Sequence, residues 1–193
     1  MNRQIPPLQK CFFFDSATFW IFTLTTKKHD SPFCLKSVIA KITSTHLLQG
    51  DLLIGKHVQS SYELRKAAIT LLATGYILID GGVQSSVQYV SNTNPIPKDK
   101  YNIAAATALA GEQLGLQFIY IDAGSGALFP ISKKMIQTIK RHISIPLIVG
   151  GGIKNYKDLE NAWIAGADIV VIGNAIEKNK DLIQSLNKRM KCN

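Results

Sequence analysis

Five short apolar runs, each ending in glycine or aspartate, constrain the fold of this chain more than any other feature. They occupy residues 51–55, 76–80, 118–122, 146–150 and 169–173. Each run is rich in Ile, Leu and Val and is apolar at successive positions, which is typical of strands buried on both faces in a parallel sheet. A half-exposed antiparallel strand would alternate apolar and polar residues instead.

Helical stretches separate these runs. Residues 99–114 are rich in alanine and are followed by Gly115, a common helix stop. Ser132 and Asn155 are suited to cap two further helices. A short helix after Gly173 and a last amphipathic helix containing Leu182 complete the pattern. The alternation of strands and helices predicts a parallel α/β fold.

The number of repeating units favours an incomplete (β/α) barrel of the TIM type. A complete barrel has eight units and usually takes about 200 to 250 residues. Five units are clear here, and residues 34–42 offer one more strand, whereas residues 1–30 form no clear unit. We therefore divide the chain into a divergent segment, 1–50, and barrel units, 51–193, and expect the early strands to be missing or unrecognisable.

Composition excludes several other classes of protein. The net charge of +9 over 193 residues is scattered, and no basic stretch interleaved with aromatic residues indicates nucleic-acid binding. The apolar stretch 12–24 contains polar residues and is too short for a transmembrane helix. The three cysteines show no CxxC spacing, which favours a reduced, cytoplasmic location. We expect a soluble protein.

Three glycine-bearing loops follow the last three runs and predict a phosphate site. They occupy residues 120–127, 149–153 and 172–175. Glycines allow tight turns that bring amide groups toward an anion, and a helix that begins beside such a loop favours negative charge. Barrel enzymes often bind phosphate with the loops after strands seven and eight and a short extra helix. The alternative is that these glycines serve only to end strands.

Asp122 and Tyr120 are candidate catalytic residues. Asp122 lies at the carboxyl end of a run, where barrel enzymes place catalytic groups, and a carboxylate there can accept a hydroxyl proton. Tyr120 lies two residues earlier and therefore shares its face of the strand. The alternatives are an aspartate that orients its own loop and an aromatic residue of the core. The four histidines have no metal-ligand spacing.

The segments that carry these loops resemble the geranylgeranylglyceryl phosphate synthase family. The resemblance covers about residues 51–177 and rests on residues 75–82, 86–97, 120–127, 146–153, 165–168 and 171–174. It implies a barrel that transfers a prenyl group from a polyprenyl diphosphate to the 3-hydroxyl of sn-glycerol 1-phosphate, a step of ether-lipid biosynthesis. The implied glycerol 1-phosphate ligands are Tyr120, Ile121, Asp122, Ala123, Gly124, Ser125, Gly126, Gly151, Gly152, Gly173 and Asn174. Asp122 stands where many members have Glu, which keeps the carboxylate but shortens its reach by one methylene.

The resemblance also implies Mg²⁺ at the diphosphate. In the family this metal is held by an aspartate in an early Asp-Pro-Asp-Lys-like stretch and by Ser or Thr after a Gly-Gly pair. Neither stretch occurs in this sequence, so we assign no metal ligand. The chain is therefore expected to be a truncated, misjoined or decayed member of the family. The family further implies a homo-oligomer, and its lipid donor implies transient contact with a membrane surface.

Two alternative functions stay open beside the prenyltransferase. One is a catalytically inactive phosphate-binding barrel fragment without a Mg²⁺ site. The other is a different phosphate-binding barrel enzyme, such as an isomerase or a flavin phosphate binder, because triple-glycine and Gly-Asn loops occur widely. The length of the prenyl chain is not indicated by the sequence.

Overall fold

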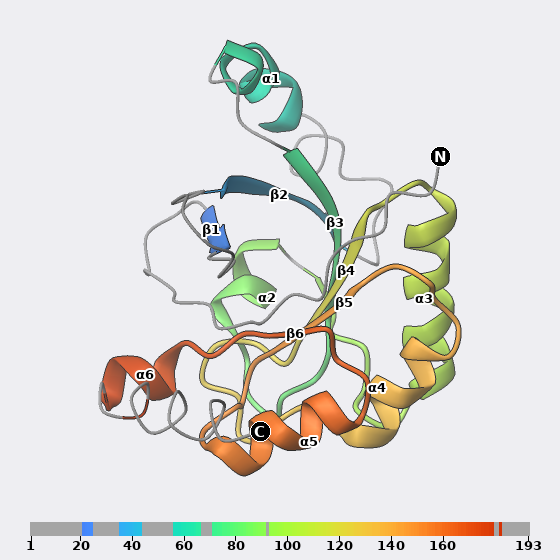
Figure 1. The fold of residues 1–193 in the computed structure, drawn as a ribbon, viewed down its shortest axis with the longest axis vertical. Helices are drawn as coiled ribbons and strands as arrows, with labels where there is room; N and C mark the ends of the chain where they lie inside the picture. Colours follow the sequence, from blue (N-terminus) through green and yellow to red (C-terminus); the bar gives the residue numbers. More distant parts are fainter. Residues whose placement is uncertain are drawn as a thin grey trace, which may run out of the picture.

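A computed structural model describes residues 21–24, 35–43, 56–66, 71–91, 93–179 and 182, and Figure 1 shows their arrangement. The strands form one six-stranded sheet whose order follows the chain. They are β1 (Ile21–Leu24), β2 (Leu35–Thr43), β3 (Leu71–Leu78), β4 (Phe118–Asp122), β5 (Leu147–Gly150) and β6 (Ile169–Val170). β1 is antiparallel to β2, and all the following neighbours are parallel.

Helices connect the parallel strands. They are α1 (Lys56–Lys66), α2 (Ser86–Ser91), α3 (Tyr101–Gln113), α4 (Lys133–Lys140), α5 (Tyr156–Ile164) and, after β6, α6 (Asn174–Lys178). A doubly wound sheet reverses its strand order near the middle. Here the order from β2 to β6 never reverses, as in a sheet that curves toward closure. The described residues therefore form part of a (β/α) barrel, as predicted.

Most predicted elements appear where the sequence indicated them. The run 118–122 is β4, the runs 146–150 and 169–173 contain β5 and β6, and the run 34–42 becomes β2. β3 begins at Leu71, five residues before the predicted run, so its first half was missed. The predicted strand 51–55 and all of the last predicted helix except Leu182 lie outside the described residues.

The start of β3 was missed because Thr74 and Gly75 interrupt its apolar character. Gly75 has a packing role: a Cβ at this position would lie 2.8 Å from Cδ1 of Leu116, so a larger residue would displace that side chain. β2 pairs with β3 from Val38↔Leu71 onward, so the parallel sheet extends into the segment 1–50.

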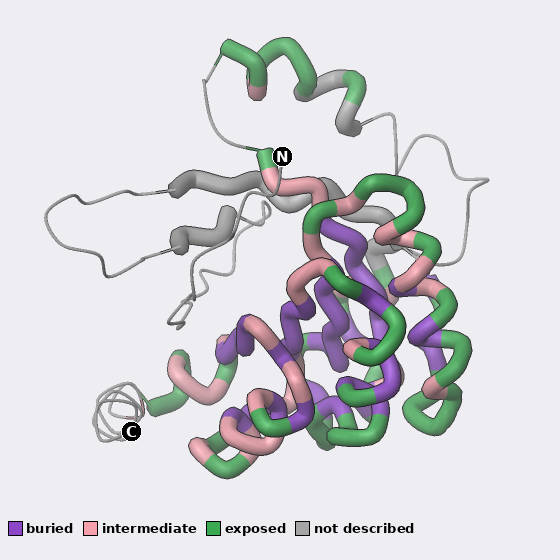
Figure 2. The backbone as a smooth tube through the Cα atoms, turned by 45° about the vertical axis from the view of Figure 1, so that its right-hand side comes forward, coloured by how far each residue is buried: buried purple, intermediate pink, exposed green. Residues whose placement is uncertain are grey.

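Side chains alternate between the two faces of the sheet, and each face has its own core. One cluster consists of Tyr76, Leu78, Tyr120, Ile148, Ile169 and Val171. The neighbouring strand residues, such as Ile77, Ile121 and Val149, pack instead with buried residues of α3, α4 and α5. Figures 1 and 2 show these helices, with their buried sides, along one face of the sheet. Val87 of α2 packs against the face that carries Tyr76 and Tyr120.

The predicted helix caps are present. The Ser132 hydroxyl accepts a hydrogen bond of 3.2 Å from the Met135 amide at the start of α4. The Asn155 side chain accepts one of 3.0 Å from the Asp158 amide at the start of α5. Gly115, at φ +86°, follows α3. No helix in the part of the chain that the structure describes is long and apolar enough to cross a membrane.

Candidate active site

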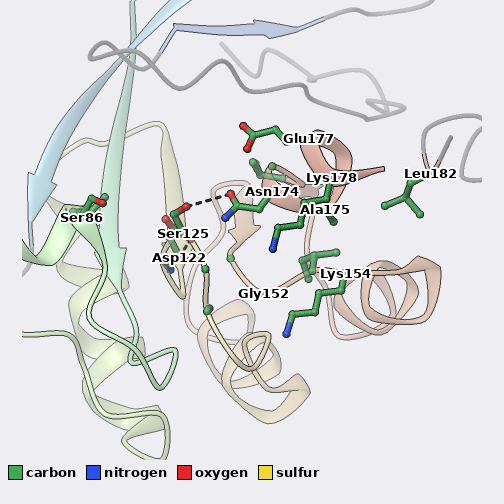
Figure 3. Close-up of a pocket in the computed structure, with 18 of the residues that line it drawn as sticks. Ser86, Asp122, Ser125, Gly152, Lys154, Asn174, Ala175, Glu177, Lys178 and Leu182 are labelled. Atoms are coloured by element: carbon green, nitrogen blue, oxygen red, sulfur yellow. Dashed lines mark hydrogen bonds between the residues drawn. The ribbon is translucent and has the colours of Figure 1, made fainter. Parts of the chain in front are cut away.

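A pocket of about 740 Å³ opens where β4, β5 and β6 end (Figure 3). The loops that follow these strands meet there because parallel strands place their carboxyl ends at one edge of the sheet. Nine of the eleven residues predicted to bind substrate line this pocket. They are Tyr120, Asp122, Gly124, Ser125, Gly126, Gly151, Gly152, Gly173 and Asn174.

The other two predicted residues face away from the pocket. Ile121 and Ala123 are buried in the core that the sheet shares with the helices. The alternation of side chains along β4 explains this placement, since Tyr120 and Asp122 point to the opposite face. Contact between a ligand and Ile121 or Ala123 would therefore have to involve the backbone.

The first glycine loop is a tight turn. The Ala127 amide donates a hydrogen bond of 3.3 Å to the Gly124 carbonyl, which closes a four-residue turn. Gly126 is the third residue of this turn and has φ +81°, a conformation that other residues adopt only with strain. A Cβ on Gly126 would meet no atom within 4 Å, so conformation rather than space requires glycine here.

The second glycine loop packs against the first so closely that its glycines leave no room for a side chain. Gly151 has φ +79°, and a Cβ there would lie 2.6 Å from both the Ala123 amide nitrogen and Oδ1 of Asp122. Gly152 has φ +70°, and a Cβ there would lie 2.6 Å from the Phe129 carbonyl oxygen. The loops after β4 and β5 can therefore meet only because both residues are glycine.

The third loop is joined to the first by a polar contact. The Ser125 hydroxyl donates a hydrogen bond of 3.2 Å to Oδ1 of Asn174, the first residue of α6, as the dashed line in Figure 3 shows. This contact connects the turn after β4 with the helix start after β6. Backbone amides in turns and at helix starts form concave sites that favour anions.

Asp122 is buried at the floor of this arrangement, with 5% of its surface exposed. Its Oδ1 accepts a hydrogen bond of 3.0 Å from the Gly124 amide, and its Oδ2 accepts one of 2.5 Å from the Tyr76 hydroxyl. The rings of Tyr76 and Tyr120 pack edge to face, with centroids 5.1 Å apart. The carboxylate is therefore fixed from two sides.

Tyr76 is a site residue that the sequence analysis missed. The sheet pairs Tyr76 with Tyr120, whereas a comparison of the runs 76–80 and 118–122 would align Tyr76 with Phe118. Both tyrosines thus occupy the same face of adjacent strands. Recognising this required the register between the two strands, which periodicity alone does not give.

Burial determines the protonation of these three groups. It raises the pKa of the Asp122 carboxyl above its ordinary value, while the hydrogen bonds from Tyr76 and Gly124 act to lower it. Burial, followed by the nearby Asp122 charge, raises the pKa of both Tyr76 and Tyr120 well above 10. The tyrosines therefore stay protonated, and an Asp122 with a raised pKa is suited to accept a proton.

The rim of the pocket carries two lysines. Lys154 and Lys178 both line it, and Figure 3 shows them projecting from separate segments. Nζ of Lys154 donates a hydrogen bond of 3.0 Å to the Leu128 carbonyl, which holds this charge beside the second loop. Glu177 also lies at the rim. Positive side chains above glycine loops favour an anionic ligand.

The described part of the chain contains no cluster of metal-binding side chains. Among these residues, no three His, Cys, Asp or Glu side chains gather to hold a metal ion. Both carboxylate oxygens of Asp122 accept hydrogen bonds within the protein, from the Gly124 amide and the Tyr76 hydroxyl. We therefore assign no Mg²⁺ ligand among the described residues.

The parallel sheet and the glycine loops at its carboxyl edge define an α/β protein of the barrel type. In a comparison with known families, the model of the PcrB family matches residues 39–190. This match covers more than half of the 193 residues, and the chain belongs to the PcrB family.

Named relatives and solved structures are also similar to this chain. The geranylgeranylglyceryl phosphate synthase of Chitinophaga pinensis is 50% identical over 139 residues, covering 70% of this chain and 54% of that protein. Among solved structures, wild-type GGGPS from Thermoplasma volcanium has a TM-score of 0.69 at 30% identity, covering 78% of this chain and 59% of that one.

A second solved structure contains a ligand. It is (S)-3-O-geranylgeranylglyceryl phosphate synthase from Thermoplasma acidophilum in complex with its substrate sn-glycerol-1-phosphate. Its TM-score is 0.68 at 28% identity, and the match covers 77% of this chain and 58% of that one. This chain thus spans little more than half the length of the proteins that it resembles.

Proposed function

We propose that this chain is a prenyltransferase of the geranylgeranylglyceryl phosphate synthase type, which joins a polyprenyl group to sn-glycerol 1-phosphate. The observation that carries the proposal is the buried Asp122 at the floor of a pocket lined by three glycine-bearing loops. Family membership and the glycerol phosphate bound in the Thermoplasma acidophilum relative support the same substrate.

In this proposal the glycine loops hold the phosphate. The amides of Ser125 and Gly126 and those around Gly151 and Gly173 bind its oxygens, and Lys154 and Lys178 add positive charge at the mouth of the pocket. Binding at these loops places the glycerol hydroxyl near Asp122. Fixing the reactants in this way can supply a large share of the rate acceleration, because a step between separate molecules becomes an intramolecular one.

Asp122 then acts as the general base. Its carboxylate accepts the proton of the glycerol 3-hydroxyl while the hydroxyl oxygen forms a bond to the first carbon of the prenyl group. The bond between that carbon and the diphosphate oxygen breaks, and pyrophosphate leaves with the electron pair. Tyr76 and Tyr120 stay protonated throughout, and the Tyr76 hydroxyl keeps Asp122 in position.

Mg²⁺ belongs to the proposal as the ion that would neutralise the diphosphate. No step above depends on it, because the described residues offer no set of ligands. We further propose that the unit 51–193 carries the glycerol phosphate site, that the protein is a cytoplasmic homo-oligomer, and that it contacts a membrane surface to collect its lipid donor.

A coupled assay tests the proposal. The purified chain is mixed with Mg²⁺, sn-glycerol 1-phosphate and geranylgeranyl or farnesyl diphosphate, and the release of pyrophosphate is followed. We expect release that requires both substrates and that falls by roughly a hundredfold or more in Asp122→Asn, because a general base contributes about that much. Glycerol phosphate binding without any release would show a phosphate-binding protein without catalysis.

A further inference from the structure

We propose that the surface beside the pocket docks on an anionic lipid bilayer. This surface, the lysine-apolar rim, consists of Val83, Leu128, Phe129, Lys98, Lys100, Lys133 and Lys134. The inference deepens the proposed function, since a lipid donor would reach the pocket from a bilayer. The inference rests on the proposed function. Its evidence is the exposure and charge of these residues.

The apolar part of the rim consists of three exposed side chains on two joined loops. Val83, Leu128 and Phe129 are 38%, 52% and 56% exposed. The Leu128 amide donates a hydrogen bond of 2.9 Å to the Gly81 carbonyl, and Gly82 packs near Leu128 and Phe129. The loops after β3 and β4 therefore present these side chains together. Large exposed side chains gathered at one place indicate a surface that meets a partner.

This apolar part adjoins the pocket. Ala127 lines the pocket and directly precedes Leu128 in the chain. Lys154, which also lines the pocket, donates its hydrogen bond to the Leu128 carbonyl. A bilayer in contact with Leu128 and Phe129 would therefore lie at the mouth of the proposed active site.

The charged part of the rim stands at helix starts, where positive charge is unfavourable. Lys133 and Lys134 are the first two residues of α4, and Lys100 is the N-cap residue of α3. The helix dipole disfavours cations at these positions. Within the described residues, the first turns of α3 and α4 hold no acidic residue to offset them. An external anionic surface would stabilise such charges.

Two of the lysines lie over aromatic rings. Nζ of Lys98 is 5.2 Å from the centre of the Phe129 ring, and Nζ of Lys134 is 4.9 Å from that of Tyr101. Two acids lie in the same region: Oδ2 of Asp99 is 3.8 Å from Nζ of Lys100, and Asp80 accepts a hydrogen bond from the Gly82 amide in the loop that carries Val83. The four lysines outnumber these two acids, and the lysine-apolar rim keeps a net positive charge.

A bilayer fits this surface better than a second copy of the chain. Apolar tips enter the boundary between headgroups and acyl chains, while lysines beside them attract anionic lipid phosphates. A symmetric contact between two copies would place the same lysines against one another, and their like charges would repel.

Co-sedimentation with lipid vesicles tests the proposal. The full chain is mixed with vesicles of phosphatidylcholine and phosphatidylglycerol in equal amounts, or of phosphatidylcholine alone. We expect sedimentation with the anionic vesicles and little with the neutral ones. In Lys133→Gln/Lys134→Gln, the partition coefficient should fall roughly fivefold for each lysine removed. Folding should be retained, because the change removes cations from a helix start.

A matched control removes the same charge elsewhere. Arg65→Gln/Lys66→Gln alters the last turn of α1, which lies at the opposite end of the sheet from α4 (Figure 1). This variant should bind vesicles like the unmodified chain. Leu128→Ser/Phe129→Ser should weaken binding without loss of the folded state, because both side chains are more than half exposed.

Three outcomes would overturn the proposal. They are no sedimentation of the unmodified chain with anionic vesicles, an equal loss in the α4 and α1 variants, and a self-association that Leu128→Ser/Phe129→Ser abolishes. Glycerol 1-phosphate binding, measured on the same samples, should be unchanged in all variants, since none of the altered residues lines the pocket. Failure of docking is thereby distinguished from failure of the proposed function.

Discussion

The Tyr76 hydroxyl lies 2.5 Å from Oδ2 of Asp122, although 46 positions separate the two residues in the chain. Asp122 pairs with Leu78 in the sheet, so Tyr76 reaches it diagonally from the adjacent strand. Both side chains are buried. A neutral donor of this kind holds a carboxylate in one orientation and partly offsets the effect of burial on its pKa.

Tyr76→Phe should therefore raise the pKa of Asp122 further. The carboxylate would lose a hydrogen bond that stabilises its charged form. If Asp122 is the base of prenyl transfer, the acidic limb of the rate profile should move to higher pH. The folded state should lose about 1.5 to 3 kcal/mol, as is usual for a hydrogen bond to a charged group.

A tyrosine on the surface provides the control for this experiment. Tyr89 is 79% exposed, and Tyr89→Phe should leave both the pH profile and the unfolding free energy unchanged. A Tyr76→Phe protein with an unchanged profile would show that the hydroxyl does not position Asp122.

Asp122→Asn should stabilise the folded protein at neutral pH. A pKa raised in the folded state means that ionised Asp122 opposes folding. The unmodified chain therefore loses stability as the pH rises from the ordinary pKa of the carboxyl toward the raised one. The melting temperature of Asp122→Asn should thus exceed that of the unmodified chain at neutral pH. The difference should shrink as the pH approaches 3.8, the ordinary value of the carboxyl. A difference independent of pH would contradict this account.

The sequence predicted those parts of the site that depend on local pattern. The alternation of side chains along a strand predicted that Tyr120 and Asp122 share one face. The turns that glycine allows indicated Gly124 and Gly126 as loop residues. The caps Ser132 and Asn155 could likewise be read from their neighbours. Each of these features is determined within a few residues along the chain.

The remaining parts of the site depend on contacts between distant segments. Tyr76 meets Asp122 through strand register, and Lys154 reaches Leu128 across 26 positions. The start of β3 was missed because Gly75 is required by its packing against Leu116 and not by local pattern. α2 was missed as well, since Ser86–Ser91 is only six residues long and too short for its apolar residues to repeat over more than one turn.

Gly151→Ala should be more damaging than an alanine at another positive-φ glycine. Gly151 and Gly115 have φ of +79° and +86°, so alanine should cost about 1 to 2 kcal/mol of backbone strain at either position. A Cβ on Gly115 meets nothing within 4 Å, whereas one on Gly151 lies 2.6 Å from Oδ1 of Asp122. Urea denaturation should show the larger loss for Gly151→Ala. Equal losses would mean that the contact with Asp122 relaxes freely.

Asp168→Ala should destabilise the fold without affecting the site. Oδ2 of Asp168 accepts hydrogen bonds from Nζ of Lys140 at 2.6 Å and from the buried Leu147 amide at 2.8 Å. Its loss should cost about 1 to 3 kcal/mol, because the amide is left without its acceptor. Lys140→Gln should cost about 1 kcal/mol or less, since that half-exposed ion pair is weak. Both variants should bind glycerol 1-phosphate like the unmodified chain.

Calorimetric titration with sn-glycerol 1-phosphate tests the central claim, the phosphate site of the glycine loops, most directly. We predict saturable binding at one site per chain, displaced by inorganic phosphate and abolished by Gly151→Val in a protein that circular dichroism shows to be folded. An absence of binding by the folded, unmodified chain, or equal binding by Gly151→Val, would contradict the claim.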